Sequence, residues 1–137
     1  MNTNMFNEAE DLFTKGNFIT SFNLFKSLTE SSEFTDLEKA EAFNMMGVII
    51  LFDPLIDIED ETGLKYFKKA LELDDENVGA LLNVVENFGL SVNNHKDTVF
   101  FNFALSQLKK INYDFSENEK KMILDKQKNI NTNSTDL

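Results

Sequence analysis

Few side chains in this sequence could carry acid–base chemistry. His95 is the only imidazole, and it lies in the polar segment 93–96, where we expect an exposed loop histidine. Glu38 and Glu41 share one helical face, but carboxylates at that spacing form a catalytic pair only where a pocket gives them different environments. The chain has no cysteine, which excludes thiol nucleophiles, disulfides and cysteine-ligated metals. We therefore expect no enzyme, no catalytic residue and no cofactor.

One acidic segment has the residue types of a calcium loop. Asp57, Glu59 and Glu61 alternate along the chain as the carboxylate ligands of such a loop do. The loop needs glycine for its sharp turn, however, and Thr62 stands in that place. Its bidentate glutamate would fall on Lys68. We therefore expect no metal site.

The charge balance bears on the partner. The net charge is −11, from 24 acidic and 13 basic residues, and all the basic residues are lysine. Nucleic-acid recognition needs a clustered positive field and favours the arginine fork, so we expect no nucleic acid partner. The acidic residues of segment 30–61 are opposed within it only by Lys39. This segment either attracts a basic partner or is a solvated surface.

Length and hydropathy bear on the number of hydrophobic cores and on whether the chain enters a membrane. A chain of 137 residues with 42% hydrophobic content can bury one core. The longest apolar run, 47–52, is far shorter than the roughly 20 residues that span a bilayer. The first residues lack the basic and apolar regions of a secretory signal. We expect a soluble, cytoplasmic protein that does not enter a membrane.

Apolar residues recur at helical spacing along most of the chain. Thr35 with Glu38, and Ser116 with Glu119, have the spacing of capping boxes that begin helices. Asp75 is expected to cap a further helix, and Asp97 or Thr98 another. The expected helices cover approximately 3–15, 18–29, 36–52, 61–74, 76–88, 98–111 and 116–128, with a turn at 89–97.

Several of these segments resemble tetratricopeptide repeats. The pattern Gly63-x3-Phe67-x2-Ala70-Leu71 is similar to the second helix of such a repeat, and Phe43-x2-Met46-Gly47-x2-Ile50 to the first. Gly47 inside a helix indicates a close helix crossing. The chain departs from the family at Ser21, where alanine is usual, and at Asp75, where proline is usual. Its segment 52–60 is about four residues longer than the pattern allows, as in Sel1-like members.

The resemblance implies an all-α fold, a right-handed stack of about three antiparallel helix pairs with a C-terminal capping helix. We expect a single domain over residues 1–128, with approximate repeats at 3–31, 35–75 and 77–112, a cap helix at 116–128 and a flexible tail at 129–137. Because 14 phenylalanines fall mainly on the helical stripes, we assign them to the core rather than to a ligand cavity.

In this family the first helix of each pair lines a concave groove. The resemblance implies a partner-binding surface made of Phe6, Glu10, Phe13, Glu41, Asn44, Val48, Leu82 and Glu86. Its carboxylates would repel the C-terminal carboxylate that some members bind. We therefore expect a protein-interaction module for a Lys/Arg-rich polypeptide, acting as an adaptor, an effector chaperone or a toxin-neutralising immunity protein. A small-molecule-binding or enzymatic domain with a cavity between helices is the alternative.

Overall fold

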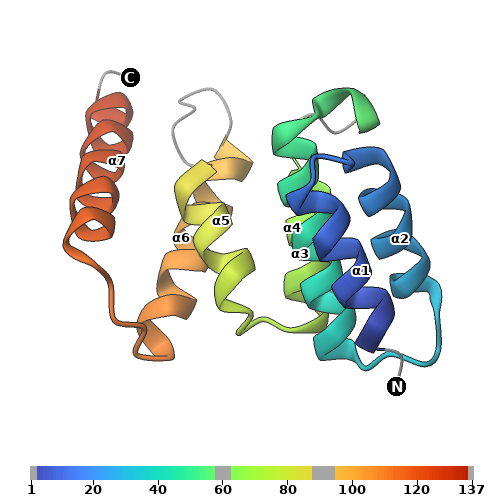
Figure 1. Ribbon diagram of the computed structural model, residues 1–137. Coiled ribbons are helices and arrows are strands. Elements are labelled where there is room, and N and C mark those ends of the chain that lie inside the picture. The colour runs from blue at the N-terminus through green and yellow to red at the C-terminus, as the bar shows by residue number, and fades with distance from the viewer. Residues whose placement is uncertain (1–2, 58–62, 88–94, 136–137) are drawn as a thin grey trace. The chain divides into compact units, whose positions relative to one another are not determined.

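The computed structural model describes residues 3–57, 63–87 and 95–135. These residues form seven α-helices and one short 3-10 helix, without a strand (Figure 1). The all-α class is therefore confirmed. The elements are α1 (Thr3–Thr14), α2 (Phe18–Glu30), α3 (Asp36–Phe52), η1 (the 3-10 helix Pro54–Asp57), α4 (Leu64–Leu73), α5 (Val78–Asn87), α6 (His95–Lys110) and α7 (Glu117–Thr135).

The chain divides into two compact units, unit 1 (residues 1–80) and unit 2 (residues 81–137), where we had expected one domain over 1–128. The division falls inside α5. The first turn of α5 belongs to unit 1 because Asn77, which precedes it, donates a hydrogen bond to Glu41 of α3 at 3.1 Å. Asn77 also caps α5, since its Oδ1 accepts the Ala80 N–H at 2.8 Å. The cap is therefore Asn77 rather than Asp75.

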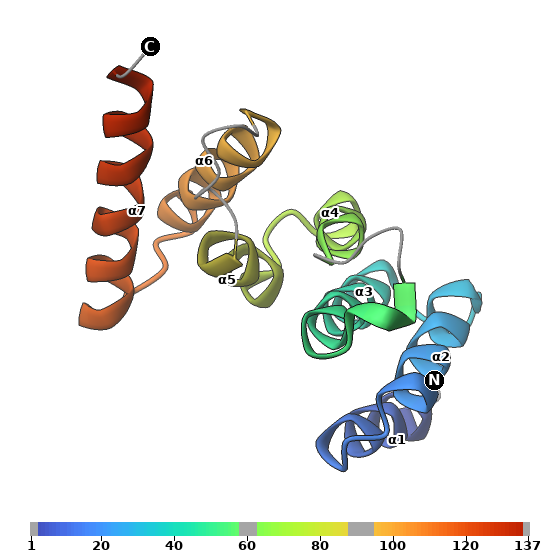
Figure 2. The ribbon, with the colours of Figure 1, turned by 90° about the horizontal axis from the view of Figure 1, so that it is seen from above.

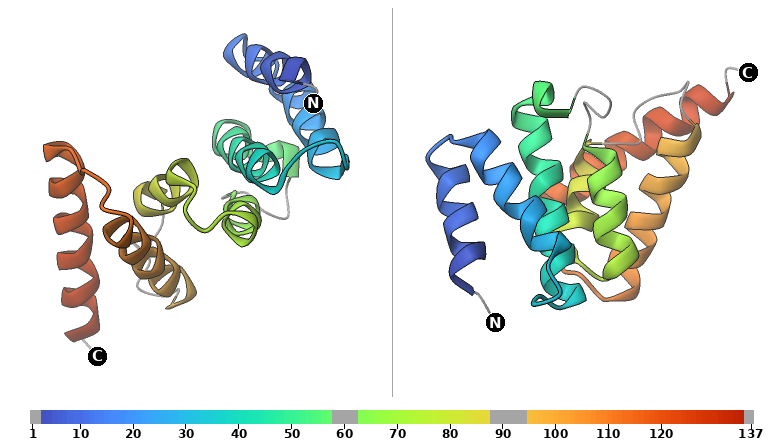
Figure 3. Two further views of the ribbon diagram at one scale, coloured as in Figure 1. Left: turned by 90° about the horizontal axis from the view of Figure 1, so that it is seen from below. Right: turned by 90° about the vertical axis from the view of Figure 1, so that its right-hand side faces the viewer.

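In unit 1 each helix packs against the next one in the chain, so α3 lies between α2 and α4 (Figure 2). Consecutive helices run in opposite directions (Figures 1 and 3). The pairwise packing follows from the apolar stripes of the sequence. The fully buried hydrophobic side chains of unit 1 include Ala9, Phe25, Leu28, Ala40, Ala42, Ile49, Ile50, Phe67, Ala70 and Ala80.

Glycine makes the crossing of α3 and α4 possible. A Cβ added to Gly47 would lie 2.6 Å from a ring carbon of Phe67, which is completely buried. Gly63 precedes α4 with φ +74°, and a Cβ there would lie 2.6 Å from the Gly47 carbonyl oxygen. The close crossing predicted at Gly47 is confirmed.

Polar contacts define the start of α3 and hold the segment that follows its end. The capping box of α3 forms as predicted, because Thr35 Oγ1 accepts the Glu38 N–H and Glu38 Oε1 accepts the Thr35 N–H. After α3, Asp57 at the end of η1 accepts the Tyr66 hydroxyl at 2.7 Å and pairs with Lys65 at 3.5 Å. Asp57 therefore anchors η1 to α4. The other two carboxylates of the calcium hypothesis, at 59 and 61, lie outside the described residues.

Unit 2 differs from the expected boundaries at both ends. Helix α6 begins at His95, so that residue opens a helix instead of lying in a loop, and the start is earlier than Asp97 or Thr98. Most of the turn expected at 89–97 lies outside the described residues. The Ser116–Glu119 capping box forms as predicted. Helix α7 then continues to Thr135, so 129–135 are helical where we had expected a tail, because extending an existing helix costs much less than starting one.

Candidate functional site

The negative charge of the chain belongs to unit 1. Residues 1–80 contain 17 acidic residues and 6 lysines, a net charge of −11, whereas residues 81–137 contain 7 acidic residues and 7 lysines, a net charge of zero. The net charge of the whole chain does not reveal this difference between the units. Any partner drawn by electrostatic attraction to negative charge is therefore drawn to unit 1.

The charges of unit 1 are also separated between its helices. Helices α1 and α3 together carry six acidic residues and one lysine. Helices α2 and α4 together carry four lysines and two glutamates. The same unit thus presents acidic helices and basic helices. Two hollows lie beside α3, one lined by α1 and α3 and the other by α2, α3 and α4.

The first hollow, which we call the acidic groove, lies between α1 and α3. It has a volume of about 320 Å³. Its walls are Phe6, Asn7, Leu37, Glu38 and Glu41. Leu37 is 65% exposed, so its side chain is accessible to a partner. An apolar wall beside two carboxylates suits a side chain or segment that is both apolar and cationic.

Hydrogen bonds hold Glu41 in place at the groove. Its Oε1 accepts from Asn44 Nδ2 at 3.5 Å, and its Oε2 accepts from Asn77 Nδ2 at 3.1 Å. Both donors are neutral amides. Neither Glu38 nor Glu41 forms an ion pair with a side chain in the described part of the molecule. The groove therefore keeps two carboxylates that a cationic partner could pair with.

The structure brings only part of the predicted surface together. Phe6 and Glu41 line the groove, but Asn44 is 4% exposed and serves to position Glu41. Phe13 instead packs in an aromatic cluster, with its ring centre 5.6 Å from that of Phe18 and 5.5 Å from that of Phe52.

The four remaining predicted residues do not line the groove. Glu10 is exposed on α1, and Val48 is half-buried on α3. Leu82 and Glu86 belong to unit 2, where Leu82 is half-buried and Glu86 is exposed. The residues that the prediction missed are Asn7, Leu37 and Glu38. Leu37 is two residues after the capping residue Thr35, and an apolar residue in the first turn between Asp36 and Glu38 was the signal that could have identified it.

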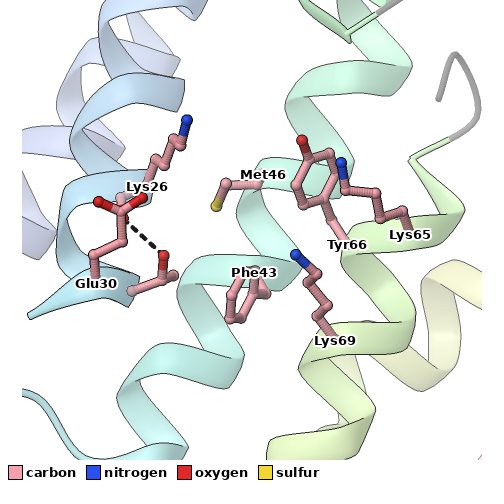
Figure 4. Close-up of a pocket in the computed structure, with 8 residues that line it drawn as sticks. Lys26, Glu30, Phe43, Met46, Lys65, Tyr66 and Lys69 are labelled. Carbon is pink, nitrogen blue, oxygen red and sulfur yellow. Dashed lines mark hydrogen bonds between the residues drawn. The ribbon is translucent and has the colours of Figure 1, made fainter. Parts of the chain in front are cut away.

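The second hollow, which we call the lysine pocket, lies on another side of α3. Glu41 and Phe43 point away from each other because two residues separate side chains by about 200° on a helix. The pocket has a volume of about 250 Å³. Figure 4 shows Lys26 and Glu30 of α2 on one side, Phe43 and Met46 of α3 between, and Lys65, Tyr66 and Lys69 of α4 on the other. Thr29 completes the lining.

Aromatic rings lie beside two of these ammonium groups. Lys69 Nζ lies 5.6 Å from the centre of the Phe43 ring, and Lys65 Nζ lies 5.0 Å from that of Tyr66. Sequence reasoning missed the pocket because its lysines are distant in sequence and meet only when α2 and α4 pack on α3. The repeated lysines of α2 and α4 were the available signal.

In unit 2 the charged group with the most unusual environment is Lys126. It is 6% exposed, and its ammonium donates hydrogen bonds to the backbone carbonyls of Val85 and Glu86 at the end of α5. It also lies 5.9 Å from the centre of the Phe101 ring. Burial lowers the pKa of Lys126, while the Glu86 carboxylate acts in the opposite direction. Because the last carbonyls of a helix carry partial negative charge, this ammonium caps α5.

The described residues show no arrangement typical of a metal centre or a membrane span. They contain no cluster of three or more His, Asp and Glu side chains that could hold a metal ion. None of the described helices is long and apolar enough to cross a membrane. Comparison with known proteins gives no relative: no family model, no curated protein and no solved structure matches this chain.

Proposed function

We propose that this protein is a non-enzymatic, TPR-like interaction module that holds an apolar, Lys/Arg-rich segment of a partner polypeptide. The observation that carries the proposal is the acidic groove, where Phe6 and the exposed Leu37 stand beside Glu38 and Glu41. Two of the residues that the repeat resemblance implies for binding, Phe6 and Glu41, line it. The module would act as an adaptor, an effector chaperone or a toxin-neutralising immunity protein.

The groove can form only part of the interface with a partner, and the surrounding acidic surface would form the rest. The volume of about 320 Å³ has room for a small number of side chains, so the groove can anchor a segment but not a whole interface. A stable protein interface buries about 800 Å² on each partner. The acidic side chains elsewhere on α1 and α3 extend the negative surface for the rest of the segment. We expect the apolar anchor to set the lifetime of the complex and the carboxylates to set the association rate.

The test uses a fluorescent synthetic peptide of alternating leucine and lysine, with association and dissociation followed by stopped flow. Glu38→Gln removes one groove charge and keeps the capping box, because glutamine also serves at that position. We expect it to slow association. Leu37→Ala should mainly raise the dissociation rate by removing the exposed apolar wall.

Matched controls come from unit 2, which carries no net charge. Glu117→Gln removes an exposed first-turn carboxylate, and Leu124→Ala removes a leucine that is 68% exposed. Both should leave the kinetics unchanged. The proposal would be wrong if the control variants changed the rates as much as the groove variants, or if a peptide with glutamate in place of lysine bound equally well.

A further inference from the structure

The lysine pocket concentrates positive charge in a unit of strongly negative charge. Unit 1 has six lysines, and three of them, Lys26, Lys65 and Lys69, line this one pocket. Of the 17 acidic residues of the unit, Glu30 is the only one in the lining. A surface that served only solubility would have no reason to gather its few cations around one hollow.

Two of the three ammonium groups are available to a ligand. Lys65 is paired with Asp57, whereas Lys26 and Lys69 form no ion pair with any of the described side chains. They come from α2 and α4, which flank α3, so their charges reach the pocket from two sides (Figure 4). An anion in the pocket can therefore be contacted by ammonium groups from both α2 and α4.

The geometry selects the kind of anion. The oxygens of a planar carboxylate lie on one side of its carbon, whereas the oxygens of a tetrahedral phosphate point in several directions and can meet donors from both helices at once. Lysine binds phosphate as a point charge from a flexible stem and does not need the arginine fork that this chain lacks. The second negative charge of a phosphate monoester also matches two ammonium groups better than a monoanion does.

The floor of the pocket selects what the phosphate is attached to. Met46 is 2% exposed and Tyr66 is 7% exposed, so the half-buried Phe43, which lies between the two sets of lysines, is the apolar side chain of the floor that a ligand can contact. Apolar and aromatic surface of this kind favours a flat or apolar group. The volume of about 250 Å³ is below the usual range for drug-sized ligands, so the bound part is small.

We propose that the lysine pocket between α2 and α4 binds a phosphate monoester with a small apolar body, its phosphate held between Lys26 and Lys69 and its body against Phe43. This site is separate from the acidic groove and does not depend on the function proposed for that groove. The ester can belong to a free small molecule or to a phosphorylated side chain of a protein, since both present the same group.

Phenyl phosphate is the probe for the test. Titration into the full chain labelled with ¹⁵N should shift the backbone amide signals of α2 and α4 around the pocket, with inorganic phosphate binding more weakly because it has no ring. Lys26→Gln and Lys69→Gln should each weaken binding about tenfold, the effect of losing one charge-assisted hydrogen bond. A phosphotyrosine peptide compared with phenyl phosphate distinguishes the two sources, because tighter binding of the peptide indicates a phosphorylated protein.

Lys68→Gln is the matched control. Lys68 is an exposed lysine of the same helix that does not line the pocket. This variant removes the same charge from the unit and should leave the affinity within about twofold of the wild type, since distant exposed charges are screened. Equal loss of affinity in Lys68→Gln and Lys69→Gln would overturn the proposal, as would equal binding of inorganic phosphate and phenyl phosphate, or no binding at millimolar probe. Urea unfolding of each variant establishes that it is folded.

Discussion

Replacing Gly47 by alanine tests the packing at the centre of unit 1. The added Cβ would lie 2.6, 2.8 and 2.9 Å from three ring carbons of Phe67, and real Cβ atoms do not approach so closely. Phe67 is fully buried, so its ring can move only by disturbing its neighbours. Overpacking of this kind costs about 1–3 kcal/mol. Alanine recovers about 0.5–1 kcal/mol of helix propensity, so from the middle of both ranges we expect a net loss of about 1 kcal/mol in the free energy of unfolding.

The assay is urea unfolding followed by far-UV circular dichroism, with Gly47→Ala, Phe67→Leu and the double variant measured together. Leucine in place of Phe67 removes the ring carbons that the new Cβ would meet. We therefore expect Gly47→Ala to cost less in the Phe67→Leu background, with a coupling free energy on the order of 1 kcal/mol. Gly47→Ala as stable as the wild type, or additive effects of the two substitutions, would refute the close crossing.

Three further substitutions test other parts of the packing. Phe67→Ala should lower the unfolding free energy by about 3–5 kcal/mol, measured by urea unfolding, because a fully buried ring is removed. Asn77→Ala should cost about 1–2 kcal/mol in the same assay, since α5 loses its cap and Glu41 loses a donor. Burial lowers the pKa of Lys126, so the unfolded chain binds that proton more tightly and stability should rise with pH between the lowered value and the ordinary 10.5. Lys126→Met should flatten that rise in unfolding curves measured across the same pH range.

The sequence predicted best those features that neighbouring residues decide. Both capping boxes formed, because Thr35 and Ser116 find their glutamates three residues ahead. The prediction of a close crossing at Gly47 was correct, because glycine lowers the stability of a helix and its place inside an apolar helix is explained by a closely packed neighbour. The cap of α5 was misplaced because Asp74, Asp75 and Asn77 are all good capping residues, and tertiary bonding to Glu41 decides among them.

Features that depend on packing between distant segments could not be predicted. Asn44 and Phe13 have the right helical positions for a binding surface, but the structure uses one to orient Glu41 and the other in an aromatic cluster. Likewise, nothing in the local sequence around Lys26 indicates that it meets Lys69 across α3. The acidic stretch 30–61 was recognised as unusual, yet the separation of charge between the acidic helices α1 and α3 and the basic helices α2 and α4 appears only when helix boundaries are known.

This separation of charge predicts opposite effects of salt on the two proposed ligands. A basic peptide approaching the acidic groove is attracted by the net charge of unit 1, so its association rate should fall as salt screens that charge over roughly 10 Å at 0.1 M. A phosphate monoester approaching the lysine pocket is repelled by the same net charge, and the ammonium groups act on it only at short range. Moderate salt screens the distant repulsion more than the contact attraction, so the association rate of phenyl phosphate should stay level or rise. If the association rate of phenyl phosphate instead fell with salt as steeply as that of the peptide, attraction by the lysines would outweigh the repulsion by the net charge of unit 1, and this reasoning would be wrong.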